Sequence, residues 1–421
     1  MPLLNRTKFV FSIRNIIINI ILMLLVFTPI FSIQESLGLI FGGIVDQSTA
    51  LTPVYVKAMK DLGFLIIILA GFIRILKLRS INKIAFLVFM YIALVLIFSF
   101  FYKNNLLIFL AGIRWILSIF LIIFLIPYIH RNLLEIIAKL LAYLFVFHFI
   151  FQIIQLFFAS GWFGLNALGL SARNPGMFFM PNTSAFFTIM VLFFTMFYLK
   201  INFFRKLIFL LSPLSLFLTA SGTGVATYIA IMSVYLLRQK YFALITVFEI
   251  ILFFVLFYTI EDITGRAGII EESFGTRIEL FFSALANSNF FSQNLGYGTS
   301  TGYLLANEYG LSFDMIATDS TYASIIVNLG LSSFVLTIVI LFVALVLAWL
   351  NKNKQILICI IIFGLFSSTT SILEAYPMNL LFSVLAAYYL GNYKKENHET
   401  PNNPCLFRSI RTLIPILSER L

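Results

Sequence analysis

A small set of arginines stands out as side chains able to act on an anionic substrate. Arg114 lies inside a long apolar run, where a charge is costly unless it meets a cavity, a partner or a phosphate. Arg173, Arg266 and Arg277 lie in the longer segments between apolar runs. A guanidinium binds phosphate through paired hydrogen bonds and does not deprotonate. These residues therefore predict a site for a phosphate-bearing ligand.

Each arginine also has an ordinary structural explanation. Arg114 lies about eight residues inside its apolar run, so its side chain can snorkel to the external membrane–water interface. Arg277 can form an ion pair with a glutamate of its own segment, such as Glu279. The sequence alone leaves both explanations open.

A carboxylate and a phenol are further candidates for residues that act on the substrate beside the arginines. Asp319 and Tyr322 stand where a polar segment enters an apolar run. A carboxylate there can act as a base toward a sugar hydroxyl, and it can equally cap a helix. Tyr322 is expected in the substrate-binding set with the arginines.

Other ionisable residues fall inside or beside apolar runs. Glu249 and His148 could belong to a proton path, but a satisfied buried polar side chain is the simpler interpretation of both. Glu374, in a short segment between two runs, could border a cavity. The sequence has no phosphate-binding loop, no nucleotide fingerprint and no paired metal-ligand motif. We therefore expect neither a cofactor nor a metal.

The elements that position these residues are membrane helices. Of the 421 residues, 61% are hydrophobic and 11% are charged, whereas soluble domains carry roughly 25% charged residues. Apolar runs close to the ~20 residues needed to cross a bilayer recur along the chain. The composition predicts an all-α, polytopic transmembrane helix bundle with about twelve spanning helices and a long, partly helical external loop. The predicted spans are 15–33, 58–76, 84–101, 106–126, 134–158, 185–200, 207–220, 225–237, 241–260, 323–348, 355–372 and 380–391.

The positive charges indicate the orientation. The net charge is +11, and lysines and arginines gather before the first predicted span and after every even-numbered one. This alternation is typical of the positive-inside rule rather than of nucleic-acid binding. We therefore expect both termini in the cytoplasm and no nucleic-acid partner. The two cysteines, Cys359 and Cys405, give no external disulfide framework.

The chain divides into four parts on this basis. Residues 1–260 hold the first nine spans, with an external segment near 159–184. Residues 261–322 form a long external loop that contains no lysine. Residues 323–391 hold the last three spans, and 392–421 form a cytoplasmic tail. The predicted seventh and eighth spans are short, so a tilted, bent or re-entrant hairpin around 221–224 is expected there.

Three stretches, in their order along the chain, resemble the O-antigen polymerase and ligase superfamily of bacterial surface-polysaccharide assembly. The first is Arg-Asn-Pro-Gly at 173–176 with Pro-Asn at 181–182. The second is Gly-Thr-Arg at 275–277 followed by Gly-Tyr-Gly at 296–298. The third is Asp-Ser-Thr-Tyr at 319–322 followed by Asn-Leu-Gly at 328–330.

The resemblance implies a glycosyltransferase in the bacterial cytoplasmic membrane. A polymerase of this kind moves a growing glycan from undecaprenyl pyrophosphate onto a lipid-linked repeat unit, at the outer face of the membrane. Arg277 and Asp319 would be catalytic, and Arg114, Arg173, Arg266 and Tyr322 would bind substrate. Expected partners are the lipid-linked oligosaccharide, membrane lipid and a chain-length regulator protein.

Two departures from the family pattern bear on the reaction. The Ser-Gly-Thr-Gly stretch at 221–224 lacks the arginine that the family often has in a serine-rich motif there. The ligase branch places a histidine near the position of Asp319, and this chain has none, which favours the polymerase. The alternatives are a ligase-type transferase and a polysaccharide or lipid transporter, although transporters usually keep their loops short.

Overall fold

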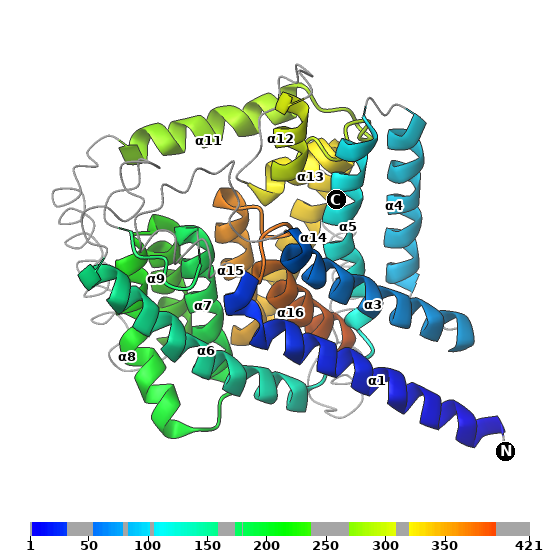
Figure 1. The fold of residues 1–421 in the computed structure, drawn as a ribbon. Helices are drawn as coiled ribbons and strands as arrows, with labels where there is room; N and C mark the ends of the chain where they lie inside the picture. The colour runs from blue at the N-terminus through cyan, green and yellow to red at the C-terminus, as the bar shows by residue number, and fades with distance from the viewer. Residues whose placement is uncertain are drawn as a thin grey trace, which may run out of the picture.

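The computed structural model describes residues 2–31, 54–78, 83–101, 105–158, 173–178, 180–236, 269–308 and 320–392, and these residues are helical with no strand (Figure 1). The helices are α1 (Pro2–Val26), the 3-10 helix η1 (Thr28–Phe31), α3 (Val54–Leu78), α4 (Lys83–Phe101), α5 (Leu106–Leu125), α6 (Arg131–Phe158), α7 (Pro181–Phe197), α8 (Asn202–Thr219), α9 (Gly222–Leu236), α11 (Ile269–Ala286), α12 (Ser300–Glu308), α13 (Thr321–Leu329), α14 (Leu331–Leu350), α15 (Lys354–Thr369) and α16 (Met378–Asn392).

Several of these helices have the length and composition of membrane spans. In the part of the chain that the structure describes, four helices are long and apolar enough to cross a membrane: α5, α6, α8 and α14. Shorter apolar helices accompany them, among them α7, α9, α15 and α16. The all-α class is confirmed, and the helices are those expected of a helical membrane protein.

Most predicted spans coincide with a helix, and some boundaries differ. The span predicted over 106–126 is α5, which begins where Asn105 accepts a hydrogen bond from the Leu107 N–H at 2.8 Å. The seventh span is not short, because α8 begins at Asn202 and reaches 18 residues. Helices α8 and α9 meet at Ala220, which adopts the left-handed conformation with φ 47°. The ninth predicted span, 241–260, lies outside the described residues.

The prediction of one continuous tenth span over 323–348 was wrong. The chain forms a short helix, α13, then bends at Gly330 and continues as α14. The rings of Tyr322 and Phe334 lie 6.2 Å apart, whereas twelve residues of straight helix would separate them by roughly 18 Å. Gly330 has φ 91°, and a Cβ there would lie 2.6 Å from the Phe290 carbonyl oxygen, so this position requires glycine.

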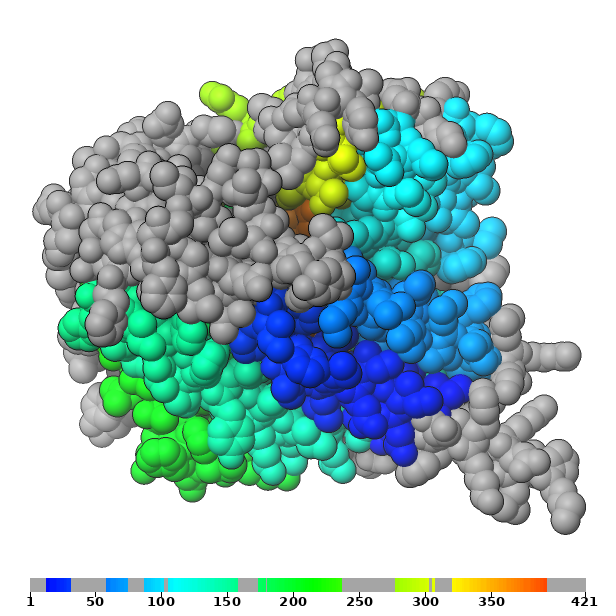
Figure 2. All heavy atoms as spheres, viewed as in Figure 1, coloured from blue at the N-terminus to red at the C-terminus, as the bar shows by residue number. Residues whose placement is uncertain are grey.

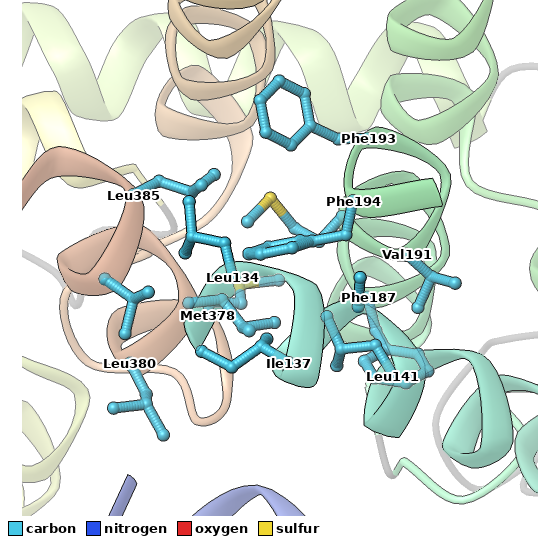
Figure 3. Packing of buried hydrophobic residues seen from close by; sticks show 14 of the residues in the cluster. Leu134, Ile137, Leu141, Phe187, Val191, Phe193, Phe194, Met378, Leu380 and Leu385 are labelled. Atoms are coloured by element: carbon cyan, nitrogen blue, oxygen red, sulfur yellow. The ribbon is translucent and has the colours of Figure 1, made fainter. Parts of the chain in front are cut away.

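The largest hydrophobic core surrounds α7. Nearly every residue from Thr183 to Met196 is buried, including four phenylalanines that are almost fully enclosed. In Figure 3 the side chains of α6, such as Leu141, and of α16, such as Leu385, pack toward Phe187 and Phe194 of α7. Helix α7 is therefore a central element and not a lipid-facing one.

One end of the bundle collects basic residues from segments far apart in the sequence. Lys200 and Arg131 both contact Glu135, the former at 2.7 Å. Tyr235 joins two more cations, because its hydroxyl accepts from Arg205 and its carbonyl accepts from Lys354 at 2.9 Å. Arg14 bonds His130, and Arg74 lies 4.8 Å from the ring of Tyr128. We call this the cationic end.

The opposite end carries the segments that connect the helices on the other side, and we call it the loop end. It includes 173–178, 289–299 and 370–377, together with α11, α12 and α13, which Figure 1 shows side by side at the top of the view. Segment 295–298 contacts the first half of α5, while the second half of α5 runs to the cationic end. Among the described residues, the cationic end and the loop end are thus two different ends of the bundle, and the predicted clusters near residues 6–8, 77–83, 238–240 and 394–395 have no described side chains.

Candidate functional site

The Gly-Tyr-Gly turn at 296–298 lies between α5 and α13. Asn328 is fully buried, and its side-chain oxygen accepts hydrogen bonds from the N–H groups of Gly296 and Gly298, at 2.8 and 3.2 Å. On the other side, a Cβ on Gly112 of α5 would lie 2.6 Å from the nitrogen of Gly296. The two backbones are therefore in direct contact, and this contact depends on glycine at both positions.

Segment 370–377 is bonded to another part of the loop end, the start of α12, through Glu374. Glu374 accepts from the backbone N–H of Ser300 at 3.0 Å and from its hydroxyl at 3.1 Å, with weaker contacts to Thr301. Because Ser300 is the first residue of α12, this carboxylate satisfies N–H groups that the helix leaves open and complements its dipole. Glu374 is thus a helix cap supplied from another segment.

Tyr376 fixes the same segment to the N-terminal helices. Its hydroxyl donates to the Leu24 carbonyl and lies 3.2 Å from the hydroxyl of Thr28. Burial raises the pKa of Tyr376, and the hydrogen bond with Thr28 only partly offsets this. The phenol therefore stays protonated and remains a donor. Lys60 of α3 lies 5.6 Å from the centre of its ring.

Arg114 has a partner that the sequence did not predict. Its Nε lies 2.8 Å from Oδ2 of Asp61, on α3. The ion pair is only partly buried, because 41% of the Arg114 side chain and 29% of the Asp61 side chain remain exposed. Ser118, one turn further along the same face of α5, donates to the Leu373 carbonyl at 2.6 Å. The ion pair therefore lies close to the segment that carries Glu374.

The surface around this region is hollowed. Figure 2 shows a recess between the yellow atoms of the α12–α13 region and the cyan atoms of α5, with the blue atoms of α3 below it. Its floor shows orange atoms, in the colour of α15 and the segment that follows it. We take the Asp61–Arg114 ion pair and the nearby segment that carries Glu374 as the candidate site.

A second polar cluster lies around segment 173–178. The side chain of Gln155 forms two hydrogen bonds to Gly176, donating to its carbonyl at 2.7 Å and accepting from its N–H at 2.6 Å. Gln152 donates to the Asn174 carbonyl at 3.1 Å. His148 lies 3.1 Å from the Ser184 hydroxyl and accepts from the Met177 N–H. The interpretation of His148 as a satisfied buried side chain is confirmed.

This cluster explains why the segment has its sequence. Gly176 has φ 64°, and a Cβ there would lie 2.5 Å from the ring of His148. The segment turns into the bundle instead of lying on its surface, so its backbone groups need buried partners. The two glutamines of α6 supply them, and Ser215 of α8 in turn donates to Gln152 at 2.7 Å. Arg173 is half-buried where the described part of this segment begins.

Replacing Gln155 with leucine should destabilise the protein strongly. The change leaves both the N–H and the carbonyl of Gly176 buried without that partner, and each such group costs about 1–3 kcal/mol. We expect a clear drop in melting temperature, measured by fluorescence-detected size exclusion of heated detergent extracts. The same Gln-to-Leu change at Gln355, which is half-buried at the start of α15, should change little. Equal melting of the two variants would contradict the role of Gln155.

The remaining predicted site residues fall in different places. Arg277 is half-buried on α11, one turn before Phe281, which packs on Phe334 of α14. Tyr322 lies against α15, where its hydroxyl donates to the Gly364 carbonyl at 3.3 Å. Asp319 and Arg266 lie outside the described residues.

The helix cap considered for Asp319 belongs to its neighbour. Ser320 is the residue before α13, and its side chain accepts from the Ala323 N–H at 3.4 Å. Its hydroxyl also donates to the Ser367 carbonyl, which fixes the start of α13 on α15. The N-cap of α13 is therefore Ser320, while Asp319 itself lies outside the described residues.

The described contacts place the predicted site residues on different elements. Arg114 pairs with Asp61 of α3, whereas Gly112, two residues earlier and on another face of α5, contacts the Gly-Tyr-Gly turn. The Arg173 segment packs instead on α6 and α8, and Arg277 lies on the helix that packs on α13.

No family model, curated protein or solved structure matches this chain. Its site is therefore described by geometry alone. In the described residues, no group of histidine, cysteine, aspartate or glutamate side chains is placed to hold a metal ion.

Sequence reasoning missed Asp61 and the two glutamines of α6. Asp61 carried a usable signal, because it is a carboxylate inside the predicted span 58–76, and intramembrane charges normally have partners. Gln152 and Gln155 carried a weaker one: with His148 they recur at helical spacing and mark a polar stripe on an apolar helix. Neither signal identifies the partner.

Proposed function

We propose that this chain is a membrane-embedded glycosyltransferase of the O-antigen polymerase type. It would transfer a growing glycan from undecaprenyl pyrophosphate onto a lipid-linked repeat unit. One observation carries the proposal: the side chain of Asn328 accepts hydrogen bonds from the N–H groups of Gly296 and Gly298. Two of the three stretches that resemble the family, far apart in the sequence, therefore meet in the fold.

The proposed reaction requires little beyond charge and position. The acceptor hydroxyl attacks the sugar carbon bonded to the diphosphate, the carbon–oxygen bond to the diphosphate breaks, and polyprenyl diphosphate leaves as an anion. Arg114, Arg173, Arg266 and Arg277 are proposed to stabilise that anion. Asp319 is proposed to accept or orient the hydroxyl proton, with Tyr322 in the substrate-binding set. The activated bond is already in the donor, so no nucleotide is consumed.

The proposed topology follows from the two ends of the bundle. The positive-inside rule assigns the cationic end, with Arg131, Lys200 and Lys354, to the cytoplasm. The loop end would then face outward, as the chemistry of a lipid-linked glycan exported across the bacterial inner membrane requires. We propose about twelve spans, with both termini cytoplasmic.

Reconstitution of the purified protein with a lipid-linked repeat unit tests the proposal. We expect a ladder of longer lipid-linked glycans without nucleotide and without an ion gradient. Movement of the repeat unit across the vesicle membrane with no change in its length would identify a transporter and overturn the proposal.

A deletion strain separates the two transferases. Loss of a polymerase leaves one repeat unit attached to the surface acceptor, whereas loss of a ligase leaves none. A strain without any attached repeat would replace the polymerase with the ligase.

A further inference from the structure

We infer that Asp61 is a positioning residue for Arg114 at the proposed glycan-transfer site. The inference rests on the proposed function and adds a residue from a helix that the sequence motifs do not include. The contact between Arg114 Nε and Asp61 Oδ2 is 2.8 Å, and it joins α5 to α3.

The position of this contact on the guanidinium group decides which of its N–H donors stay available to a ligand. Arginine carries five N–H donors in one plane, one on Nε and four on the terminal nitrogens. Asp61 contacts the Nε edge, and 41% of the Arg114 side chain stays exposed. A carboxylate at Nε restricts rotation of the plane, and the exposed part of the side chain can meet a second anion.

The apolar surroundings of Arg114 explain why its orientation depends on an ion-pair partner. Arg114 follows Gly112 and precedes Ser118 on a helix whose neighbours are mostly apolar, so its orientation would otherwise be set by snorkelling toward water. Asp61 holds it against α3 instead, one turn of α5 from Ser118, which bonds the Leu373 carbonyl. The diphosphate of the lipid carrier is the anion that this arrangement would receive.

The negative charge of Asp61 gives the inference a distinctive consequence. A carboxylate beside Arg114 weakens its attraction for a diphosphate, so its removal should not weaken binding of the lipid-linked donor. Removal of the Asp61 carboxylate should instead let the Arg114 guanidinium group rotate more freely. Misplacement of a catalytic group costs up to roughly 10²-fold in rate. Asp61→Asn should therefore lower kcat by about tenfold or more while KM stays level or falls.

The test uses the full-length protein in vesicles with the lipid-linked repeat unit as probe. The kcat and KM of Asp61→Asn are compared with those of Glu135→Gln, which removes a carboxylate from the 2.7 Å pair with Lys200 at the cationic end. The control should keep both constants at the wild-type values. Wild-type constants for Asp61→Asn would overturn the inference and leave the proposed function standing, whereas absence of polymer from the wild type would overturn the proposed function itself.

An exchange of the two charges distinguishes positioning from simple pairing. The double variant Asp61→Arg with Arg114→Asp keeps an ion pair between α3 and α5 but moves the cation to the other helix. We expect it to elute as a folded monodisperse protein and to make no polymer. Recovery of wild-type polymer by the double variant would mean that the pair only holds the helices together, and the inference would fail. If Asp61→Asn fails to fold, Asp61→Glu keeps the charge on a longer stem, and a fall in kcat at an unchanged melting temperature then supports positioning, while a wild-type kcat overturns it.

Discussion

Arg277→Ala is expected to abolish the polymer while leaving a single repeat unit on the surface acceptor. Loss of one donor to a developing charge typically lowers a rate by roughly 10²–10³-fold, enough to remove long chains from a glycan ladder. The fold should survive, because Arg277 is half-buried while α11 packs through residues such as Phe281. The measurement is the ladder of a deletion strain complemented with each variant at equal protein levels.

Two matched variants sharpen this experiment. Glu279→Gln changes an exposed charge two residues away on the same helix and should leave the ladder normal. Arg277→Lys keeps the charge but loses the planar pair of donors, so it should give shorter chains than the wild type. A normal ladder in Arg277→Ala would remove this residue from the proposed site.

Gly296→Ala is expected to have the largest effect on folding. Gly296 has φ 102°, a conformation that costs a residue with a side chain about 1–3 kcal/mol. Its Cβ would also collide with the carbonyl oxygen of Ile108 on α5, and this backbone atom cannot move out of the way by rotating. Overpacking of this kind costs about 1–3 kcal/mol more. We expect a large fall in melting temperature, or no monodisperse protein.

Gly222→Ala is the control for that change. A Cβ on Gly222, the first residue of α9, would meet no atom within 4 Å. Its effect on stability should therefore stay within about 0.5 kcal/mol. If Gly296→Ala melted at the same temperature as Gly222→Ala in detergent, the close contact between the Gly-Tyr-Gly turn and α5 would be refuted.

Helix positions were predictable where apolar length and a local stop signal agree. The span predicted over 106–126 matches α5 because Asn105 caps one end and Pro127 follows the other. The span predicted over 185–200 began four residues late, because α7 begins at Pro181, a residue suited to the first turn of a helix. In both cases the information that marks the boundary lies within a few residues of it, although only the first boundary was predicted correctly.

The bend at Gly330 was not predictable in this way. Apolar residues continue on both sides of it, so hydropathy gives a single run and no sign of a change in direction. The conformation is imposed by a distant segment, since the Leu331 N–H donates to the Asn289 carbonyl and a Cβ on Gly330 would approach Phe290. A hydropathy profile contains no information about contacts between segments that are distant in the sequence.

The candidate site shows the same division. Arg114 was identifiable because a charge in an apolar run is unusual, but its partner was not, since Asp61 lies on another helix. The role of Asn328 was hidden in a short motif; only the fold shows that its side chain holds two N–H groups of a turn some thirty residues earlier. Sequence identified the unusual residues, and the tertiary structure supplied their partners.

The burial of α7 has a consequence for how the protein is made. This helix is enclosed by α6, α8 and α9, which are neighbours in sequence, and also by α15 and α16, which leave the ribosome more than 150 residues after it. Phe186 packs against Phe366 of α15, with the rings 5.1 Å apart. A nascent chain that stalls before Lys354 therefore has one flank of its central helix uncovered, and this part of the core is complete only after α15 and α16 have been made.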